Sequence, residues 1–255
     1  MSLPIHWTVV ERSRIDLSTP ETFLSPAELQ KLGTMRFPKR RGEWLLGRWA
    51  AKSLARSLPD FSRCQPAALE IRSQTGGAPY LHVLYGTCPQ HSLSISHSGN
   101  LAFCALTLAA GVSVGADLEK VEPRTDEFLE DYFTPAEWKQ VRLCPADTRD
   151  LTANLIWSAK EAMLKSLGVG LRWDTRQVEV IQIGGSVERE KAREGWQDLE
   201  VEAAAAGAGT FQGWWKPWGD YVLSVVARSA GGIDLTSIDL VEARGWGVYG
   251  LGSSQ

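Results

Sequence analysis

FLSPAELQKL at residues 23–32 returns in altered form as YFTPAEWKQV at residues 132–141. Each copy places a hydroxyl residue before a proline and a glutamate three positions after the hydroxyl. The paired positions are Ser25 and Thr134, Pro26 and Pro135, and Glu28 and Glu137. A hydroxyl cap, a proline at the first helical position and a glutamate at the third form a capping box, which is typical of a helix start. The sequence therefore predicts two helices that begin in the same way.

The repetition extends beyond these two helix starts. In the same order and at nearly the same spacing, IHWTVV at 5–10 parallels VGADLE at 114–119, WAAK at 49–52 parallels WSAK at 157–160, and LAFCALTL at 101–108 parallels YVLSVVAR at 221–228. Each half then runs from a strand through a capped helix and a long helix to turn-rich strands. This pattern predicts an α+β fold of two similar halves joined near residues 109–113, with a ligand site at their shared face.

The domain boundaries follow from this repeat. We expect residues 1–110 to form the first half and residues 111–230 the second. The Gly- and Ser-rich segment 231–255 is expected to be a loosely attached, flexible tail. The segment 184–213 is charged and then reads AAAAGAG, which suggests a surface excursion with little to pack. A duplicated chain of this kind is expected to work as a monomer.

Composition narrows the class of protein. Hydrophobic residues make up 44% and charged residues 22%, which is typical of a globular chain. A net charge of -3 and a pI near 5.9 give no overall attraction to nucleic acid. The four cysteines are too scattered for a zinc cluster or a disulfide framework. Without a signal-peptide pattern or an apolar run long enough to span a bilayer, we expect a cytoplasmic protein with no membrane contact.

Two acidic residues lie in the strand-like segment GVSVGADLEKV, residues 111–121. Apolar residues alternate with Ser113, Gly115, Asp117 and Glu119, a period of two that is typical of a strand. Asp117 and Glu119 then project from one side, about 6 to 7 Å apart. Two like charges on one strand face favour a bound cation, although acidic residues also occur on the solvated ends of strands.

A third acidic residue lies in the helical segment WSAKEAMLK, residues 157–165. Glu161 and Lys165 are four residues apart, so this could be no more than a surface ion pair worth about 0.3 to 0.5 kcal/mol. Together with Asp117 and Glu119, however, Glu161 makes three carboxylates without a nearby His or Cys, which suits Mg²⁺ better than zinc. Magnesium keeps few protein ligands and commonly binds substrate phosphates, so a phosphate-bearing substrate is indicated.

Basic residues are concentrated in MRFPKRRGEWLLGRWAAK, residues 35–52. They are Arg36, Lys39, Arg40, Arg41, Arg48 and Lys52. The segment can be interpreted as the solvated face of an amphipathic helix or as a wall that binds an anion, because arginine forks match phosphate geometry. The acidic net charge and the lack of an aromatic RNA-binding strand disfavour nucleic acid as the ligand.

A histidine marks a turn in SLSISHSGNLAFCALTL, residues 92–108. Two alternating apolar runs flank HSGN, which predicts a strand, a tight turn and a returning strand. His97 is expected at that turn, with Ser96, Ser98 and the backbone of Gly99 as nearby hydrogen-bond donors. It is either an ordinary polar surface residue or part of a binding site.

Taken together, GADLEKV, WSAKEAMLK, the SISHSG turn and RRGEWLLGRWAAK resemble the Sfp-type 4'-phosphopantetheinyl transferase family, over about residues 20–228. The resemblance implies a pseudo-dimer of two α+β halves with the active site at their interface. It implies a transferase that moves 4'-phosphopantetheine from coenzyme A to a serine of an apo acyl or peptidyl carrier protein, with Mg²⁺, and releases 3',5'-ADP. The carrier could serve fatty acid, polyketide or nonribosomal peptide synthesis.

The resemblance also implies residue roles. Asp117, Glu119 and Glu161 correspond to the magnesium ligands, Lys165 to the pyrophosphate contact, Ser96 and His97 to a phosphate-contacting turn, and Arg41 and Arg48 to contacts with 3'-phosphoadenosine. Glu161, Lys165 and His97 are the implied catalytic residues, with Glu161 or a water that it holds as the base. Lys160 matches the family without an assigned role. Where the family often has Gly-Lys-Pro, this chain reads GGAPYL at 76–81, so Ala78 lacks the lysine.

Two other functions remain open. One is a different magnesium-dependent phosphoryl or nucleotidyl transferase that acts on a diphosphate, although GxxxxGKS and kinase-type glycine loops are missing from the sequence. The other is a carrier-binding module without catalytic activity, which the presence of all three acidic positions disfavours.

Overall fold

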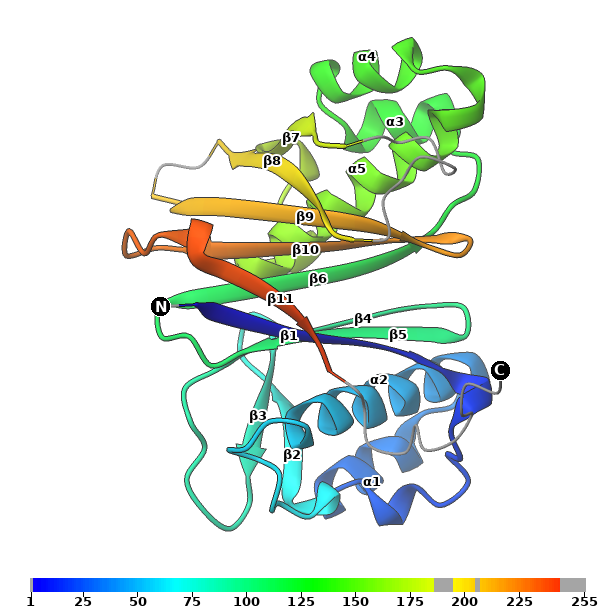
Figure 1. Cartoon of the computed structure of the whole chain (residues 1–255). Coiled ribbons are helices and arrows are strands. Elements are labelled where there is room, and N and C mark those ends of the chain that lie inside the picture. Colours follow the sequence, from blue (N-terminus) through cyan, green and yellow to red (C-terminus); the bar gives the residue numbers. More distant parts are fainter. Residues whose placement is uncertain (1, 186–194, 205–206, 244–255) are drawn as a thin grey trace, which may run out of the picture.

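The computed structural model describes residues 2–185, 195–204 and 207–243. The first half begins with strand β1, continues with two helices and ends with four strands (Figure 1). Its elements are β1 (Leu3–Glu11), α1 (Pro26–Thr34), α2 (Pro38–Arg56), β2 (Leu69–Ser73), β3 (Pro79–Val83), β4 (Ser92–Ser98) and β5 (Leu101–Thr107).

The second half repeats this order with one additional helix. Its elements are β6 (Val112–Lys120), α3 (Asp126–Tyr132), α4 (Pro135–Leu143), α5 (Ala146–Ser166), β7 (Val178–Ile183), β8 (Gln197–Ala203), β9 (Thr210–Trp218) and β10 (Tyr221–Ser229). A last strand, β11 (Ile238–Glu242), follows. The expected α+β fold of two similar halves is therefore confirmed, with the change from one half to the other between Thr107 and Val112.

Both helix starts have the predicted capping box. The side chain of Ser25 accepts a hydrogen bond from the backbone N–H of Glu28, whose carboxylate accepts one from the backbone of Ser25. Thr134 and Glu137 make the same reciprocal pair at the start of α4. The repeated tetrapeptide thus specifies α1 and α4 because it satisfies the free N–H groups of each first turn locally.

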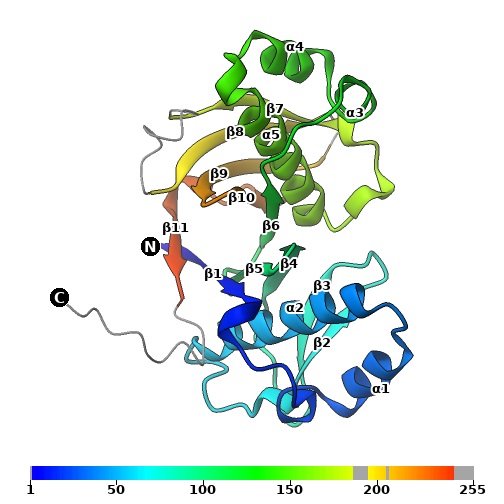
Figure 2. The same ribbon diagram turned by 90° about the vertical axis from the view of Figure 1, so that its right-hand side faces the viewer.

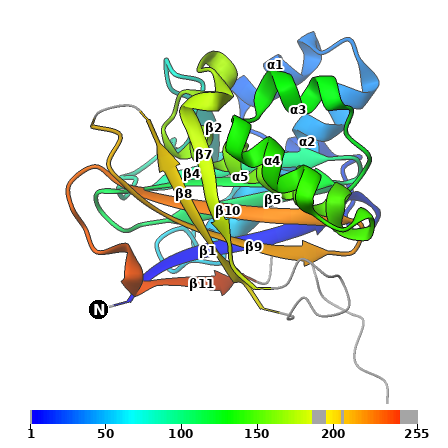
Figure 3. The same ribbon diagram turned by 90° about the horizontal axis from the view of Figure 1, so that it is seen from above.

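The strands form two main sheets, one for each half. The first has the order β11-β1-β5-β4 and the second β6-β10-β9-β8-β7, while β2 and β3 form a separate hairpin. Helix α2 lies along the first sheet and α5 along the second, and Figure 2 shows both helices on the same side of the molecule. Seen from above, α4 and α5 cover one side of the second sheet (Figure 3). An apolar core fills the space between the two sheets. It runs from Ile5, Trp7 and Phe103 on one side to Val114 and Val225 on the other.

Serine side chains join the two halves where β4 runs beside β6. Ser92 Oγ accepts from the backbone N–H of Val114 (2.9 Å), and Ser94 Oγ accepts from that of Ala116 (2.9 Å). Ser96 Oγ donates to the carboxylate of Asp117 (2.8 Å). The alternating serines of SLSISHS therefore face a neighbouring strand and supply hydrogen bonds that a backbone ladder would otherwise make.

Two expectations about the chain after residue 184 need correction. Residues 197–203 of the supposed surface excursion form β8 inside the second sheet, while 186–194 and 205–206 lie outside the described residues. The supposed flexible tail contains β11, which pairs in parallel with β1 from Leu3 to Trp7. The Gly and Ser content had suggested weak attachment, but IDLV in β11 supplies apolar residues for pairing. Residues 244–255 lie outside the described residues.

Candidate active site at the seam between the two halves

A close approach between α5 and β6 forms the base of the site. A Cβ atom on Gly115 would lie 1.8 Å from the carbonyl oxygen of Ala162, so only glycine lets the backbone of α5 rest directly on β6. The strand face with Asp117 therefore points toward α5 and not toward solvent, and Asp117 is only 2% exposed. The predicted alternation is correct, but the alternative of a solvated acidic face is wrong for Asp117.

Lys165 joins groups from three elements. Its Nζ donates to Asp117 Oδ1 on β6 (2.6 Å) and to Ser96 Oγ on β4 (3.2 Å), and lies 3.6 Å from Glu161 Oε2 on its own helix. Burial alone would lower the pKa of Lys165, but the two carboxylates outweigh it and raise the pKa. Lys165 is therefore a firmly charged ammonium group that contacts both halves.

Glu119 lies at the other end of the acidic face. Trp157 Nε1 donates to one carboxylate oxygen (3.2 Å) and Arg124 to the other (3.1 Å). Burial raises the pKa of Glu119 to about 7, and the negative charges of Asp117 and Glu161 add to the rise, which Arg124 opposes. The charges of Asp117 and Glu161 thus affect the protonation of Glu119.

No sequence pattern selected Trp157 or Arg124 as neighbours of Glu119. Arg124 follows β6 in a loop, and its Nε donates to Asn154 Oδ1 on α5 (2.8 Å). A single arginine in a loop has no spacing that distinguishes it from other surface arginines. Trp157 belongs to the quoted helix motif, but only the packing of α5 on β6 shows which side chain its indole N–H reaches.

The chemistry of the acidic side chains fits a hard divalent cation. Asp117 Oδ2 is buried and has no hydrogen-bond partner among the described residues, so it offers an unused acceptor at the centre of the cluster. In this structure, however, Lys165 pairs with Asp117 and Glu161, and Arg124 pairs with Glu119. No group of three His, Cys, Asp or Glu side chains within the described ranges is arranged to hold a metal ion. Binding Mg²⁺ would therefore involve an exchange of these ion-pair partners.

The other implied contacts lie in the first half. His97 is the penultimate residue of β4, just before the turn at Gly99 and Asn100, and its exposed ring lies 4.0 Å from a carboxylate oxygen of Glu43 on α2. The hairpin itself is as predicted, with Gly99 at a left-handed φ of 58°. His97 therefore lies on the strand and not at the turn, and its ring is near α2 of its own half.

The two arginines that the resemblance selected have different surroundings. Arg41 is half-buried and donates to the carbonyl of Leu32 (2.8 Å). Arg48 has a side chain only 11% exposed, lies over the ring of Trp44 and is 3.6 Å from a carboxylate oxygen of Glu28. Arg48 thus takes part in the internal contacts of the first half, whereas Arg41 bonds a backbone carbonyl near the end of α1.

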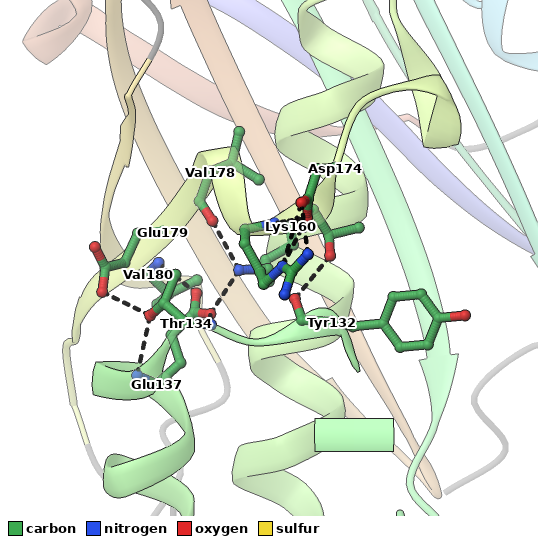
Figure 4. Close-up of polar contacts among 10 residues, drawn as sticks. Tyr132, Thr134, Glu137, Lys160, Asp174, Val178, Glu179 and Val180 are labelled. Atoms are coloured by element: carbon green, nitrogen blue, oxygen red, sulfur yellow. Dashed lines mark hydrogen bonds and ion pairs between the residues drawn. The ribbon is translucent and has the colours of Figure 1, made fainter. Parts of the chain in front are cut away.

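Lys160 has a structural environment that explains its place in the motif. Its fully buried Nζ donates to Glu137 Oε2 (2.5 Å) and to the carbonyl of Val178 (2.7 Å), as Figure 4 shows. The other oxygen of Glu137 accepts from the backbone N–H of Val180 (2.8 Å). Thr134 in turn donates to Glu179 (2.7 Å). Lys160 therefore ties α5 to the start of α4 and to β7.

The first half contains the same network. Lys52 donates to Glu28 Oε2 (2.5 Å) and to the carbonyl of Phe23 (2.6 Å). Glu28 Oε1 accepts from the backbone N–H of Ile71 on β2 (3.1 Å), and Ser25 donates to Glu70 (2.7 Å). The repeated lysine of WAAK and WSAK thus bonds the repeated glutamate of the capping box. Glu161, one residue after Lys160, is free to face β6.

A cavity of about 460 Å³ opens between the halves beside Lys165. One wall is the 76–79 turn with residues 93–95 of β4. The opposite wall is Lys165 with residues 168–170 and Arg172, which follow the end of α5. Ala78 is part of the first wall, so the sequence position that lacks the family lysine lines this cavity.

None of the described helices is long and apolar enough to cross a membrane.

Comparison with known proteins agrees with the sequence resemblance. Residues 113–226 match the family model of the 4'-phosphopantetheinyl transferase superfamily. Over 106 residues the chain is 31% identical to a 4'-phosphopantetheinyl transferase from Bacillus subtilis, a match that covers 42% of this chain and 44% of the relative. Over 164 residues it is 28% identical to a phosphopantetheinyl transferase from Thraustochytrium sp., covering 59% and 54%. The matches thus span about half the length of these relatives.

Among solved structures, the chain is similar to a holo-(acyl-carrier-protein) synthase from Bacillus anthracis in complex with CoA (3',5'-ADP). That similarity has 24% identity and a TM-score of 0.36, and covers 42% of this chain and 96% of the other. The family resemblance inferred from the motifs is confirmed for residues 113–226, which carry Asp117, Glu119, Glu161 and Lys165.

Proposed function

We propose that this protein transfers 4'-phosphopantetheine from coenzyme A to a serine hydroxyl of an apo carrier protein and releases 3',5'-ADP. The observation that carries the proposal is the cluster in which Lys165 contacts Asp117, Glu161 and Ser96 at the seam. Lys165 and both carboxylates of this cluster lie inside the stretch that matches the 4'-phosphopantetheinyl transferase family model. The reaction breaks the bond between the pyrophosphate oxygen and the phosphorus that carries pantetheine, and forms a bond from that phosphorus to the serine oxygen.

Asp117, Glu119 and Glu161 would hold Mg²⁺, which when bound offsets negative charge on the pyrophosphate and on the leaving 3',5'-ADP. Lys165, already charged and directed to the seam, binds a pyrophosphate oxygen. Glu161 accepts the proton of the attacking serine, directly or through a water. Burial raises the pKa of Glu161, with Asp117 adding to the rise and Lys165 opposing it. A raised pKa makes the carboxylate a better proton acceptor than an ordinary glutamate.

Further contacts would bind the nucleotide end of coenzyme A. The exposed imidazole of His97 at the end of β4 contacts a phosphate, and Ser96 supports Lys165 and Asp117. Arg41 contributes to binding 3'-phosphoadenosine, and Arg48 acts there only if it leaves Glu28. The cysteines are unpaired, which fits a reducing compartment such as the cytoplasm. The carrier could belong to fatty acid, polyketide or nonribosomal peptide synthesis.

The test is to incubate the protein with coenzyme A, Mg²⁺ and a panel of apo carrier proteins and to follow carrier mass. We expect at least one carrier to gain phosphopantetheine while 3',5'-ADP is released in equal amount. Lys165→Met should abolish the gain, whereas Lys139→Met, an exposed lysine on α4, should not change it. Turnover of a diphosphate without any carrier mass gain would instead indicate another phosphoryl or nucleotidyl transferase.

A further inference from the structure

We propose that Arg172 is a specificity-determining residue that binds a phosphate group of coenzyme A in the cavity between the halves. This inference rests on the proposed function and adds a contact that the sequence motifs did not indicate. Arg172 takes the place, from the opposite half of the molecule, of the cation that Ala78 does not supply.

The chain after α5 is shaped to bring Arg172 to the cavity. Helix α5 ends at Ser166, and left-handed backbone at Gly168 (φ 72°) and Gly170 (φ 55°) turns the chain into a short 3-10 helix, Gly170–Arg172. Such φ values favour glycine. On the other side, a Cβ on Gly76 would lie 2.7 Å from the carbonyl oxygen of Gly168, so the backbones of the two halves touch here. The segment GVGLR thus places an arginine at the rim of the seam.

Two neutral acceptors fix the guanidinium of Arg172. Its Nε donates to the carbonyl of Val169 (3.1 Å), and one terminal nitrogen donates to the carbonyl of Gly76 across the seam. A guanidinium has five N–H donors, so three remain for a ligand. Because both acceptors are carbonyls, the positive charge itself is not balanced by either contact.

The charge balance of the cavity singles out Arg172. No Asp or Glu is among the described residues that line the cavity, and its cations are Lys165 and Arg172. The charge of Lys165 is shared with Asp117 and Glu161, whereas no carboxylate forms an ion pair with Arg172 in the described part of the chain. Glycine backbone, Pro79 and Ile95 make up much of the remaining wall.

This combination suits one kind of ligand. An apolar wall that is partly backbone accommodates a flat or uncharged portion of a ligand, while the guanidinium of an arginine matches two oxygens of a phosphate. Coenzyme A offers such a group at its 3'-phosphate and at its pyrophosphate. Ala78 lies on the facing wall, so a single cation at either position reaches the same space. The absence of a lysine at 78 is thereby offset by Arg172.

The test measures coenzyme A binding by titration calorimetry with EDTA present, so that the result does not depend on a loaded metal or on turnover. Arg172→Ala should weaken binding by about tenfold to a hundredfold, the usual range for one charge-assisted hydrogen-bonded contact. The matched control is Arg142→Ala, which removes an exposed arginine from α4 and should leave the affinity unchanged. Coenzyme A and 3'-dephospho-coenzyme A are titrated in parallel. A loss confined to coenzyme A assigns the contact to the 3'-phosphate, and an equal loss on both assigns it to the pyrophosphate.

Two further variants separate charge from structure. Arg172→Gln keeps an amide donor that can bond Gly76 but has no charge, and should bind as weakly as Arg172→Ala. Adding Ala78→Lys to Arg172→Ala should restore most of the affinity. The inference is overturned if Arg172→Ala binds like Arg142→Ala, or if Arg172→Gln binds like the wild type. If the wild type binds no coenzyme A, the proposed function fails as well.

Discussion

Replacing Lys160 with methionine isolates the role of the buried ion pair in the second half. Lys160 is fully buried, and its ammonium is 2.5 Å from Glu137 and 2.7 Å from the carbonyl of Val178. Methionine fills most of the same volume, so the cavity that remains is small. The main change is that the carboxylate of Glu137 is left buried without its cation.

Breaking a buried ion pair from one side costs about 3 to 5 kcal/mol of unfolding free energy, because an uncompensated charge remains. Burial already raises the pKa of Glu137 with Lys160 present, and removing Lys160 raises it further. A folded-state pKa above the unfolded value means that the folded protein holds the proton more tightly. The stability of Lys160→Met should therefore fall as pH rises from the unfolded pKa of Glu137 through its folded pKa.

The assay is chemical denaturation followed by tryptophan fluorescence at several pH values. Lys52→Met is the matched control, because Lys52 makes the same contacts in the first half. It should lose less stability than Lys160→Met, since Arg48 remains 3.6 Å from the orphaned Glu28 while Glu137 has no comparable second cation among the described residues. A third variant, Lys160→Met with Glu137→Gln, removes this carboxylate and should lose the part of the pH dependence that comes from Glu137, leaving the part that comes from Glu119.

Three results would refute this reasoning. They are a loss below about 1 kcal/mol for Lys160→Met, a loss that does not depend on pH, and a larger loss for Lys52→Met than for Lys160→Met.

Three other predictions concern the seam. Asp117→Ala and Glu161→Gln should each leave a folded protein whose carrier modification, followed by mass, is reduced by orders of magnitude; near-normal rates would contradict the assigned roles. The pKa of Glu119 is raised from 4.5 to about 7, so the metal-free protein loses stability as pH rises through that window. Because Mg²⁺ favours the ionised form of Glu119, it should raise the melting temperature more at about pH 8 than at about pH 5.5. An equal shift at both pH values would exclude Glu119 as a ligand. Ser94→Ala leaves the buried N–H of Ala116 without its partner and should cost about 1 to 3 kcal/mol in denaturant unfolding, whereas a neutral effect would show that the serine contact does not stabilise the seam.

Features encoded within a few residues could be predicted from the sequence. The two capping boxes were found because the groups that satisfy the first helical turn lie within three positions of each other. The alternation in β6 was also found, because a strand places every second side chain on one face. The repeat then gave the order of elements in each half, since like sequences form like elements.

Features that depend on contacts between distant segments could not be predicted. The serines of β4 follow the same period as a solvated face, and only the position of β6 shows that they bond the other half. The acidic face of β6 is buried because Gly115 admits α5, which no local pattern indicates. Lys160 could not be assigned a role from the sequence, because its partner Glu137 is 23 residues away. Arg172 and Gly76 are 96 residues apart.

The pairing of β11 with β1 has a consequence for how the chain is made. The ribosome produces the first half early, yet the outer border of its sheet is completed only by residues 238–242, after the whole second half has been synthesised. Until then β1 presents open backbone N–H and C=O groups along one side, a surface to which other strands can add. The nascent first half is therefore complete in sequence well before its sheet has all four strands, and β11 takes over from β1 as the edge strand only once residues 238–242 have been made.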